Sequence, residues 1–304
     1  MPTEDDETQN ATGRISVVRD QHLVPLLGSI EDPPSGVQAW KGVLLERHVV
    51  RPGEVPEHEH PDLCLHLQLT GDAEYEWWSE GKNQVEHTRP GSLILLPPGT
   101  RDRLEWRRPS KRLILSVKNN GLADLAQELG AVRTPEFEEH WSLFDPTLGN
   151  VVTEMGNEAQ RNWPLGTLYA DLLVMGLETQ LLRRHSTVHI QKRTFQGGLT
   201  MPRLRRAMEY MNANLAEDLG LEKIAQELNL SSYHFAREFR SSTGQTPYQY
   251  LLDQRMAKAR NLLRTTKWPV QYVSALTGFR SSVNFVRTFR QRVGQTPDAW
   301  RKSV

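Results

Sequence analysis

The sequence predicts two domains of different fold class, an all-β N-terminal domain with a helical extension and an all-α C-terminal domain. Three observations indicate this division. The chain has 304 residues, enough for two cores of ordinary size. Its first third alternates short apolar runs with Pro, Gly and Asp, which is typical of antiparallel strands and turns. Its C-terminal part repeats a helical pattern at an offset of fifty residues.

The charges divide unevenly, although the formal net charge of the whole chain is zero. Residues 199–304 contain 17 Lys and Arg against 8 Asp and Glu, a net charge of +9. Subtraction from the totals of 37 and 37 leaves 20 against 29, or −9, for residues 1–198. A basic half is attracted to polyanions such as nucleic acids, although a solvated basic face is an equally common alternative.

The composition argues against secretion, membrane insertion and structural zinc. Cys64 is the single cysteine, so no intramolecular disulfide and no zinc-finger spacing exists. The first residues, MPTEDDETQNATG, are acidic and polar, unlike a signal peptide, and no apolar run approaches the length of a membrane span. We therefore expect a cytoplasmic protein without membrane contact.

The repeat consists of SSYHFAREFRSSTGQTP at 231–247 and SSVNFVRTFRQRVGQTP at 281–297. The two segments are identical at ten of seventeen positions. Each copy predicts a helix, because it begins with two Ser residues that can cap it, has Phe at positions i and i+4, and ends in Gly and Thr-Pro. The buried pairs would be Phe235 with Phe239 and Phe285 with Phe289.

A shorter apolar helix precedes each copy, at 221–228 and at 270–277, followed by the turns Asn229-Leu230 and Gly278-Phe279. Short helix, tight turn and second helix form the helix-turn-helix pattern, predicted over about 221–242 and 270–292. The outward side of each second helix would enter the major groove, where Arg reads guanine and Asn reads adenine. The predicted DNA-contacting residues are Tyr233, Ala236, Arg237, Arg240, Ser282, Val283, Asn284, Val286, Arg287 and Arg290.

Residues 248–264 join the two units and predict one continuous helix, because they contain no Gly or Pro and place apolar residues at helical spacing. Such a helix spans roughly 25 Å, which suits two recognition helices near one DNA turn, about 34 Å, apart. A helical solenoid is the alternative, but it needs about three repeats, and the outward faces here are basic.

The C-terminal half resembles the AraC/XylS family of bacterial transcription regulators over about 204–301. The segment that carries the resemblance is Gly278-Phe279-x-Ser281-x3-Phe285-x-Arg287-x-Phe289-Arg290-x3-Gly294-x-Thr296-Pro297, followed by Trp300-Arg301. The resemblance implies a seven-helix domain whose helices at about 231–242 and 281–292 contact double-stranded promoter DNA, with RNA polymerase as a further partner. Gly220 departs from the family where Ser often caps a helix, and Ala236 departs where relatives are often polar.

In the acidic half, apolar or alternating runs at 42–50, 63–69, 74–78, 92–96 and 112–117 predict an antiparallel β-sandwich or barrel. Two stretches resemble the motifs of cupins: Gly53-x4-His58-x-His60 and Gly91-x5-Pro97-x-Gly99-x2-Asp102. The fold class is therefore multidomain, with a cupin-like barrel and helical extension before the helix-turn-helix domain.

The resemblance to metal-binding cupins is incomplete, because Asp102 replaces the histidine of the second motif and Cys64 or Leu65 lies near the position of the usual Glu. We therefore expect no catalytic residues, no metal and no cofactor, and a small-molecule effector pocket lined by His58, His60, Trp77, Arg101 and Trp106. For each of these residues a purely structural role is an equal alternative. A metal-dependent cupin enzyme with a DNA-binding appendage is the alternative function.

Residues 122–185 predict helices, and the segment 165–184 carries apolar residues on more than one side. This helix either contributes to a homodimer or packs within its own domain. The predicted boundaries are a disordered tail at 1–14, the cupin-like sensor domain at 15–118, the helical extension at 119–185, a linker at 186–200 and the DNA-binding domain at 201–304. Together they predict a regulator controlled by an effector or by dimerisation.

Overall fold

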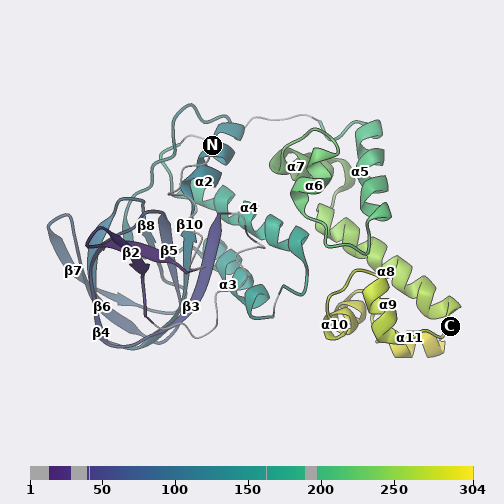
Figure 1. Ribbon diagram of the computed structural model, residues 1–304, viewed down its shortest axis with the longest axis horizontal. Coiled ribbons are helices and arrows are strands. Elements are labelled where there is room, and N and C mark those ends of the chain that lie inside the picture. Colours follow the sequence, from purple (N-terminus) through teal and green to yellow (C-terminus); the bar gives the residue numbers. More distant parts are fainter. Residues whose placement is uncertain (1–13, 29–39, 41, 162, 189–196, 304) are drawn as a thin grey trace. The chain divides into compact units, whose positions relative to one another are not determined.

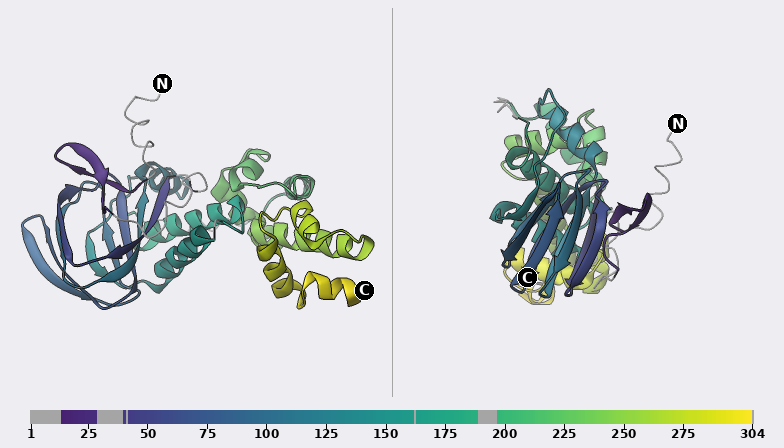
Figure 2. Two further views of the ribbon diagram at one scale, coloured as in Figure 1. Left: turned by 60° about the horizontal axis from the view of Figure 1, so that its bottom comes forward. Right: turned by 90° about the vertical axis from the view of Figure 1, so that its left-hand side faces the viewer.

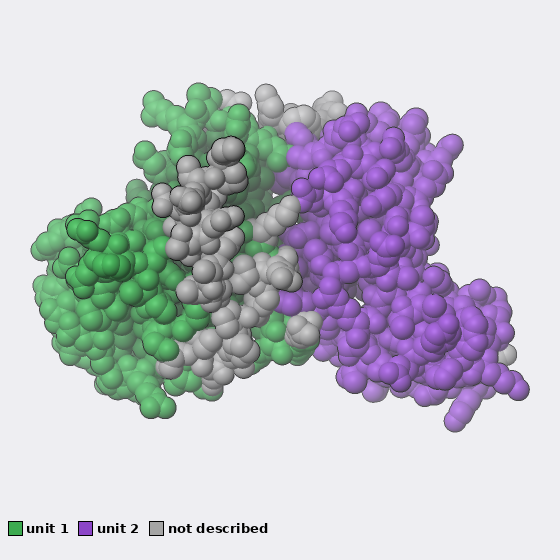
Figure 3. Space-filling view, viewed as in Figure 1, with its two compact units in different colours: residues 1–162, 173–193 green, residues 163–172, 194–304 purple. Residues whose placement is uncertain are grey.

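The computed structural model describes residues 14–28, 40, 42–161, 163–188 and 197–303 (Figure 1). Internal contacts divide the chain into two compact units, shown in different colours in Figure 3. Unit 1 comprises residues 1–162 and 173–193, and unit 2 comprises residues 163–172 and 194–304. Helix α4 (Thr167–Arg184) therefore begins in unit 2 and continues in unit 1. Residues 1–13 of the predicted tail at 1–14 and residues 189–196 of the predicted linker at 186–200 lie outside the described residues.

Unit 1 is built on two antiparallel sheets, which confirms the predicted all-β fold. The six-stranded sheet has the order β2-β1-β4-β9-β6-β7, and the five-stranded sheet has the order β11-β8-β5-β10-β3. The β1–β2 hairpin, purple in Figure 2, lies at the edge of its sheet. The strands are β1 (Ser16–Arg19), β2 (His22–Pro25), β3 (Val43–Val50), β4 (Gly53–Glu59), β5 (Leu63–Thr70), β6 (Ala73–Ser79), β7 (Lys82–Thr88), β8 (Leu93–Leu96), β9 (Arg101–Trp106), β10 (Ser110–Val117) and β11 (His140–Leu143).

The burial of each strand shows which sides of the sheets are covered. In β6 every second residue is buried, because one side of the strand faces the interior and the other faces solvent. In β5 both sides are buried from Leu63 to Gln68. The second side of this sheet is covered by α3 (Pro146–Gln160), which approaches it through glycines: a Cβ on Gly156 would lie 2.6 Å from Leu113 Cδ1. Figure 1 shows this helix beside the sheet.

The helical extension of unit 1 contains α2 (Asn119–Glu128), α3 and most of α4. The Asp145 carboxylate caps α3 by accepting from the backbone N–H groups of Thr147 and Leu148, at 2.9 and 3.2 Å. It also pairs with Arg184 and His185 at the end of α4. This carboxylate therefore joins the start of α3 to the end of α4. Within the described residues, no helix is long and apolar enough to cross a membrane.

Unit 2 is all-α, and its helices follow the predicted repeat closely. The two helix-turn-helix pairs are α6 with α7 and α9 with α10, and α8 connects them as one continuous helix (Figures 1 and 2). A helix of 19 residues is about 28 Å long. The helices are α5 (Met201–Ala213), α6 (Leu221–Gln226), α7 (Ser232–Thr243), α8 (Pro247–Thr265), α9 (Val270–Leu276), α10 (Ser282–Val293) and α11 (Pro297–Ser303).

Candidate functional site

The second helix of each pair has the same start and the same end. The Ser231 hydroxyl accepts from the backbone N–H of His234 at 3.2 Å, and the Ser281 hydroxyl accepts from that of Asn284 at 3.4 Å. Gly244 and Gly294 end the helices with φ of 75° and 88°, a left-handed conformation that favours glycine. The Ser and Gly of the sequence repeat therefore define α7 and α10 as equivalent helices.

The inward side of each helix is held by a pair of buried aromatic rings. The ring centroids of Phe235 and Phe239 are 5.5 Å apart in α7, and those of Phe285 and Phe289 are 5.7 Å apart in α10. All four side chains are buried. Burial of two Phe side chains on one side of a helix fixes which residues face away from the core.

The outward side carries most of the predicted DNA-contacting residues. Arg240, Arg287 and Arg290 are exposed, and the Val283 side chain is 79% exposed. An exposed valine in the first turn of α10 is consistent with contact to a thymine methyl group. The remaining outward residues are half-buried: Tyr233, Arg237, Ser282 and Val286. The Arg237 guanidinium lies over the Tyr233 ring, with Cζ 5.6 Å from the ring centroid.

Two predicted contact residues do not lie on this exposed side. Ala236 is only 4% exposed and Asn284 only 6% exposed. A short helix in a compact helical domain is covered on more than one side, so a single inward stripe of Phe underestimates its buried surface. The Asn284 Nδ2 amide donates to the Pro164 carbonyl at 2.8 Å, and its Oδ1 accepts from Arg287 Nη2 at 2.9 Å. In this structure the Asn284 amide is thus bonded within unit 2.

The turn of the second pair depends on a glycine. Gly278 has φ of 79°, and a Cβ there would lie 2.7 Å from the Leu215 carbonyl oxygen and 2.8 Å from Arg255 Nη2. No L side chain fits both the conformation and the space. In the first pair Asn229 occupies the corresponding turn, with φ of 53°. Asn tolerates the left-handed conformation better than other non-glycine residues, which explains its use there.

Arg255 of α8 is a buried residue that the sequence analysis did not single out. Its Nε donates to the Leu215 carbonyl at 2.9 Å and its Nη2 donates to the Glu217 carbonyl at 2.8 Å. Burial lowers the pKa of the guanidinium. The signal in the sequence was an Arg within the apolar stripe of 248–264, four residues after Leu251. Arg255 therefore stabilises the domain and is not part of the outward side of α7 or α10.

The segment 163–172 also joins the DNA-binding unit, which the sequence did not reveal. The Thr167 backbone N–H donates to Asp218 Oδ1 at 2.9 Å, and the Leu221 N–H at the start of α6 donates to Asp171 Oδ2 at 2.7 Å. Asp218 also pairs with Arg280, in the turn before α10. Together with the bond between Pro164 and Asn284, these contacts connect the beginning of α4 to both helix-turn-helix pairs.

In unit 1, the structure places four of the five predicted pocket residues in the interior. His58, His60, Trp77 and Trp106 are buried. Arg101 lies elsewhere: its side chain is 72% exposed and pairs with Glu59 at 2.7 Å. Successive side chains of a strand point to opposite sides. In β9, Asp102, Leu104 and Trp106 face inward, so Arg101 and every second residue after it face outward.

His58, His60 and Asp102 form a buried cluster with one candidate ligand atom from each residue, all within 4.8 Å of one another. His58 Nδ1 is 2.8 Å from the Pro56 carbonyl, so this nitrogen donates, which leaves the lone pair of Nε2 free for a metal ion at a point 3.8 Å from Asp102 Oδ1. Two imidazoles and a carboxylate are a donor set that transition metals accept. The ligand types therefore fit a metal better than the incomplete motif suggests.

A proton competes with any metal in this cluster. His60 Nε2 lies 2.9 Å from Asp102 Oδ1. Burial lowers the pKa of His60, but the neighbouring Cys64 and Asp102 side chains outweigh burial and raise this pKa to about 10. At neutral pH, His60 is thus protonated and paired with Asp102. Metal binding would have to displace that proton.

Two helix-turn-helix pairs on a connecting helix, with exposed arginines on equivalent helices, define a DNA-binding protein. A family model described as a helix-turn-helix domain matches residues 224–303. The chain is 35% identical over 218 residues to the MmsAB operon regulatory protein of Pseudomonas aeruginosa, covering 70% of this chain and 66% of that protein. It is 31% identical over 181 residues to the transcriptional activator RhaS of Enterobacter sp., covering 58% of this chain and 62% of that protein.

Among solved structures, a transcriptional regulator from Chromobacterium violaceum described by its AraC-type DNA-binding domain is 32% identical, with a TM-score of 0.32, over 33% of this chain and 90% of that one. The chain thus matches less than two thirds of the length of the two curated relatives. Residues 224–303 are therefore a helix-turn-helix domain, and the chain is similar to transcription regulators of the AraC type.

Proposed function

We propose that this chain binds double-stranded promoter DNA in a sequence-specific way and regulates transcription, without enzymatic activity. The observation that carries the proposal is the pair of equivalent helices, α7 and α10, with Arg240, Arg287 and Arg290 exposed on them. The connecting helix α8, about 28 Å long, is comparable to one DNA turn of about 34 Å. One chain can therefore read two consecutive major-groove segments.

Selection of bound DNA from a random library, followed by a salt titration on the selected site, tests this proposal. We expect a motif with two segments about one helical turn apart, which binds more tightly than random DNA at every salt concentration. Recovery of no motif, with weak binding that disappears as salt rises, would leave only nonspecific attraction between the +9 charge of residues 199–304 and phosphate.

The proposal has two further parts. Unit 1 regulates DNA binding through a small-molecule effector or through homodimerisation, and the chain contacts RNA polymerase. The polar interior of the β unit supports an effector, because a purely structural core would be filled by apolar side chains. An effector changes DNA binding only if it binds one state of the protein more tightly than another. Light scattering measures homodimerisation, and DNA titration with and without candidate effectors measures control by a small molecule.

The cluster of His58, His60 and Asp102 favours one second candidate, a metal-dependent enzyme with a DNA-binding appendage. Metal analysis of the purified protein separates the candidates. Stoichiometric iron, manganese or zinc that is lost in His58→Ala would support a metal centre, and turnover of a substrate would be needed to make it an enzyme. Protein that stays metal-free after incubation with each metal would remove this candidate.

A further inference from the structure

Arg112 is a buried cation in the interior of unit 1. It lies on β10, its side chain is 0% exposed, and it faces the interior together with Ile114. Its Nε donates to the Ser110 hydroxyl at 3.1 Å and its Nη2 donates to Gln68 Oε1 at 3.0 Å. Its Nη1 is buried and has no hydrogen-bond acceptor among the described residues. A buried guanidinium nitrogen without an acceptor is costly and needs an explanation.

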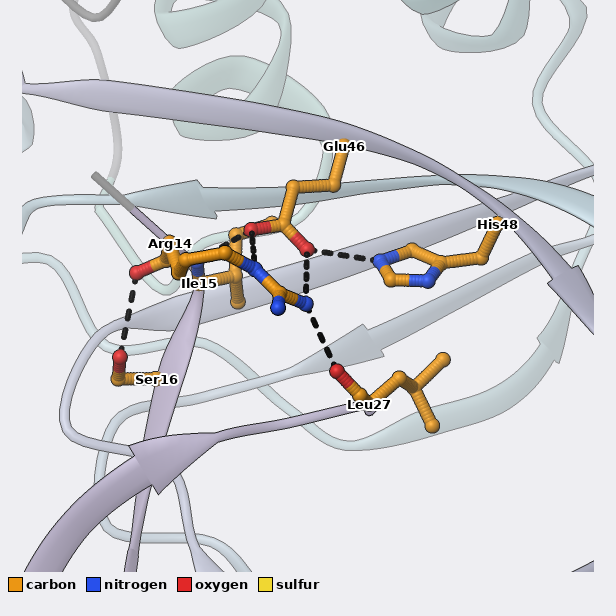
Figure 4. A network of polar contacts seen from close by, with 6 residues as sticks. All are labelled: Arg14, Ile15, Ser16, Leu27, Glu46 and His48. Atoms are coloured by element: carbon orange, nitrogen blue, oxygen red, sulfur yellow. Dashed lines mark hydrogen bonds and ion pairs between the residues drawn. The ribbon is translucent and has the colours of Figure 1, made fainter. Parts of the chain in front are cut away.

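No carboxylate of the described residues pairs with Arg112, because the acidic groups of the interior have other partners. Glu46 pairs with Arg14 at 3.1 Å and with His48 at 2.8 Å, as Figure 4 shows. Asp102 pairs with His60 at 2.9 Å. Burial lowers the pKa of Arg112 to about 10, so the group is still charged at neutral pH. Within the described part of the interior, one positive charge is therefore left without a counter-charge.

The surroundings of this charge are aromatic. Arg112 Cζ lies 4.3 Å from the Trp106 ring centroid and 5.6 Å from that of Tyr75. Trp77 belongs to the same buried cluster and stacks on Trp141 with centroids 4.6 Å apart. The indole nitrogens of Trp77 and Trp106 are also buried donors without an acceptor among the described residues. Three unpartnered donors in one apolar cluster call for a ligand that supplies acceptors.

We propose that the interior of unit 1 binds a small organic monocarboxylate, with its carboxylate on Arg112 and its apolar body against the Trp77 and Trp106 rings. A single uncompensated cation matches a single negative charge, and the unpartnered Nη1 of Arg112 would donate to a carboxylate oxygen in a charge-assisted hydrogen bond. A dianionic phosphate would carry one charge too many for this interior. The inference rests on the proposed function, in which unit 1 receives the effector.

A structural role for Arg112 makes the opposite prediction about stability. If the cation stabilises the empty core through its contact with Trp106, Arg112→Met lowers the melting temperature. If the cation is kept for a ligand, removal of its buried charge leaves the melting temperature of the free protein unchanged or higher. Gln68 Oε1 would still accept from the Thr88 hydroxyl at 2.6 Å, so the substitution leaves no new unsatisfied acceptor there.

The experiment uses the full chain and measures melting temperature and tryptophan fluorescence with phenylacetate or hexanoate, and with their neutral amides, at up to about 10 mM. We expect both carboxylates to raise the melting temperature and change the fluorescence, and the amides to do neither. Arg112→Met should weaken carboxylate binding at least about tenfold, and Arg112→Lys should weaken it less. Lys111→Met, an exposed position on the same strand, is the matched control.

Three outcomes would overturn the proposal: no response to either carboxylate, an equal response to the amides, or a response that persists in Arg112→Met. A fall of several degrees in the melting temperature of Arg112→Met without ligand would assign the residue to structure instead. These readouts do not involve DNA. A selected DNA motif without a carboxylate response would leave the proposed regulator intact and refute the ligand class. A carboxylate response without a selected DNA motif would support the ligand class and refute the proposed sequence-specific regulator.

Discussion

Substitution of Gly278 by alanine tests whether the turn of the second helix-turn-helix pair is fixed by both backbone conformation and space. Gly278 and Gly244 have nearly equal φ, 79° and 75°. A Cβ on Gly244 meets nothing within 4 Å, whereas one on Gly278 would lie 2.7 Å from the Leu215 carbonyl oxygen. Gly244→Ala therefore isolates the conformational cost, and the difference between the two variants measures the cost of the lost space.

The left-handed conformation costs a non-glycine residue about 1–2 kcal/mol, partly offset by the lower entropy of alanine in the unfolded chain. Gly244→Ala should thus lower the free energy of unfolding by about 1 kcal/mol. Gly278→Ala must also displace Arg255, whose hydrogen bonds to the Leu215 and Glu217 carbonyls are worth about 1.5–3 kcal/mol each. A total loss of about 2.5–4 kcal/mol follows if one bond is lost.

Calorimetry of the full chain is the assay, with attention to the transition assigned to unit 2. We expect a fall in its melting temperature of about 4–8 °C for Gly244→Ala and at least about 10 °C for Gly278→Ala. Gly294→Ala, with φ of 88° and open space around its Cβ, should behave as Gly244→Ala does. Equal losses for Gly278→Ala and Gly244→Ala would refute the role of Arg255 and Leu215 in this turn.

Three further predictions concern other parts of the chain. Arg287→Ala should weaken binding to the selected DNA site by about 1–3 kcal/mol in a DNA titration if this arginine reads a base; an equal loss on every sequence would make it a phosphate contact. Asn284→Ala should lower the unfolding free energy of the DNA-free protein by about 1–2 kcal/mol in denaturant titrations, because the Pro164 carbonyl loses its donor; unchanged stability would disprove that contact. Burial and, to a lesser extent, the nearby Asp124 carboxylate raise the pKa of Glu178 to about 7. The folded protein therefore holds a proton that the unfolded chain releases near pH 4.5, and stability should fall by on the order of 3 kcal/mol as pH rises between these values. Glu178→Gln should flatten that fall, and an unchanged slope would contradict it.

The helical repeat was predictable because its physical causes are local. A Ser cap, a Phe pair four residues apart and a C-terminal Gly lie within one stretch of 14 residues, so a single sequence displays them together. The predicted helices at 231–242, 270–277 and 248–264 agree with α7, α9 and α8 to within a residue or two. The strands with continuous apolar runs, such as β5 and β10, were predicted for the same reason.

Two strands outside the predicted apolar runs, β7 and β9, carry charged or polar residues on their solvent side. β9, with the sequence RDRLEW, and β7, with the sequence KNQVEHT, contain few apolar residues, and their assignment depends on pairing with β6. Long-range pairing of this kind leaves little trace in local composition. The outward position of Arg101 follows from the strand alternation, which only the register of β9 reveals.

Burial of Ala236 and Asn284 had a different cause. Helical periodicity identifies the side that faces the largest apolar neighbours, but it does not show how many elements cover a helix. Asn284 contacts a residue 120 positions earlier in the chain. A pairing between positions so distant has no signature in one sequence. Arg112 was overlooked because an arginine in a strand is usually exposed, and its burial depends on both sheets.

The position of helix α4 determines how this protein can be divided for experiments. A fragment that begins at residue 200, the boundary suggested by composition, would lack Pro164, Thr167 and Asp171. Its Leu221 N–H and Asn284 amide would then be released to water, and Asp218 would retain only Arg280 of its described partners. DNA affinities measured on such a fragment would describe a recognition helix freed from a contact that the intact chain makes. A fragment that begins at residue 163 keeps these bonds, and comparison of the two would measure the effect of residues 163–199, which include the segment 163–172 of unit 2, on DNA binding.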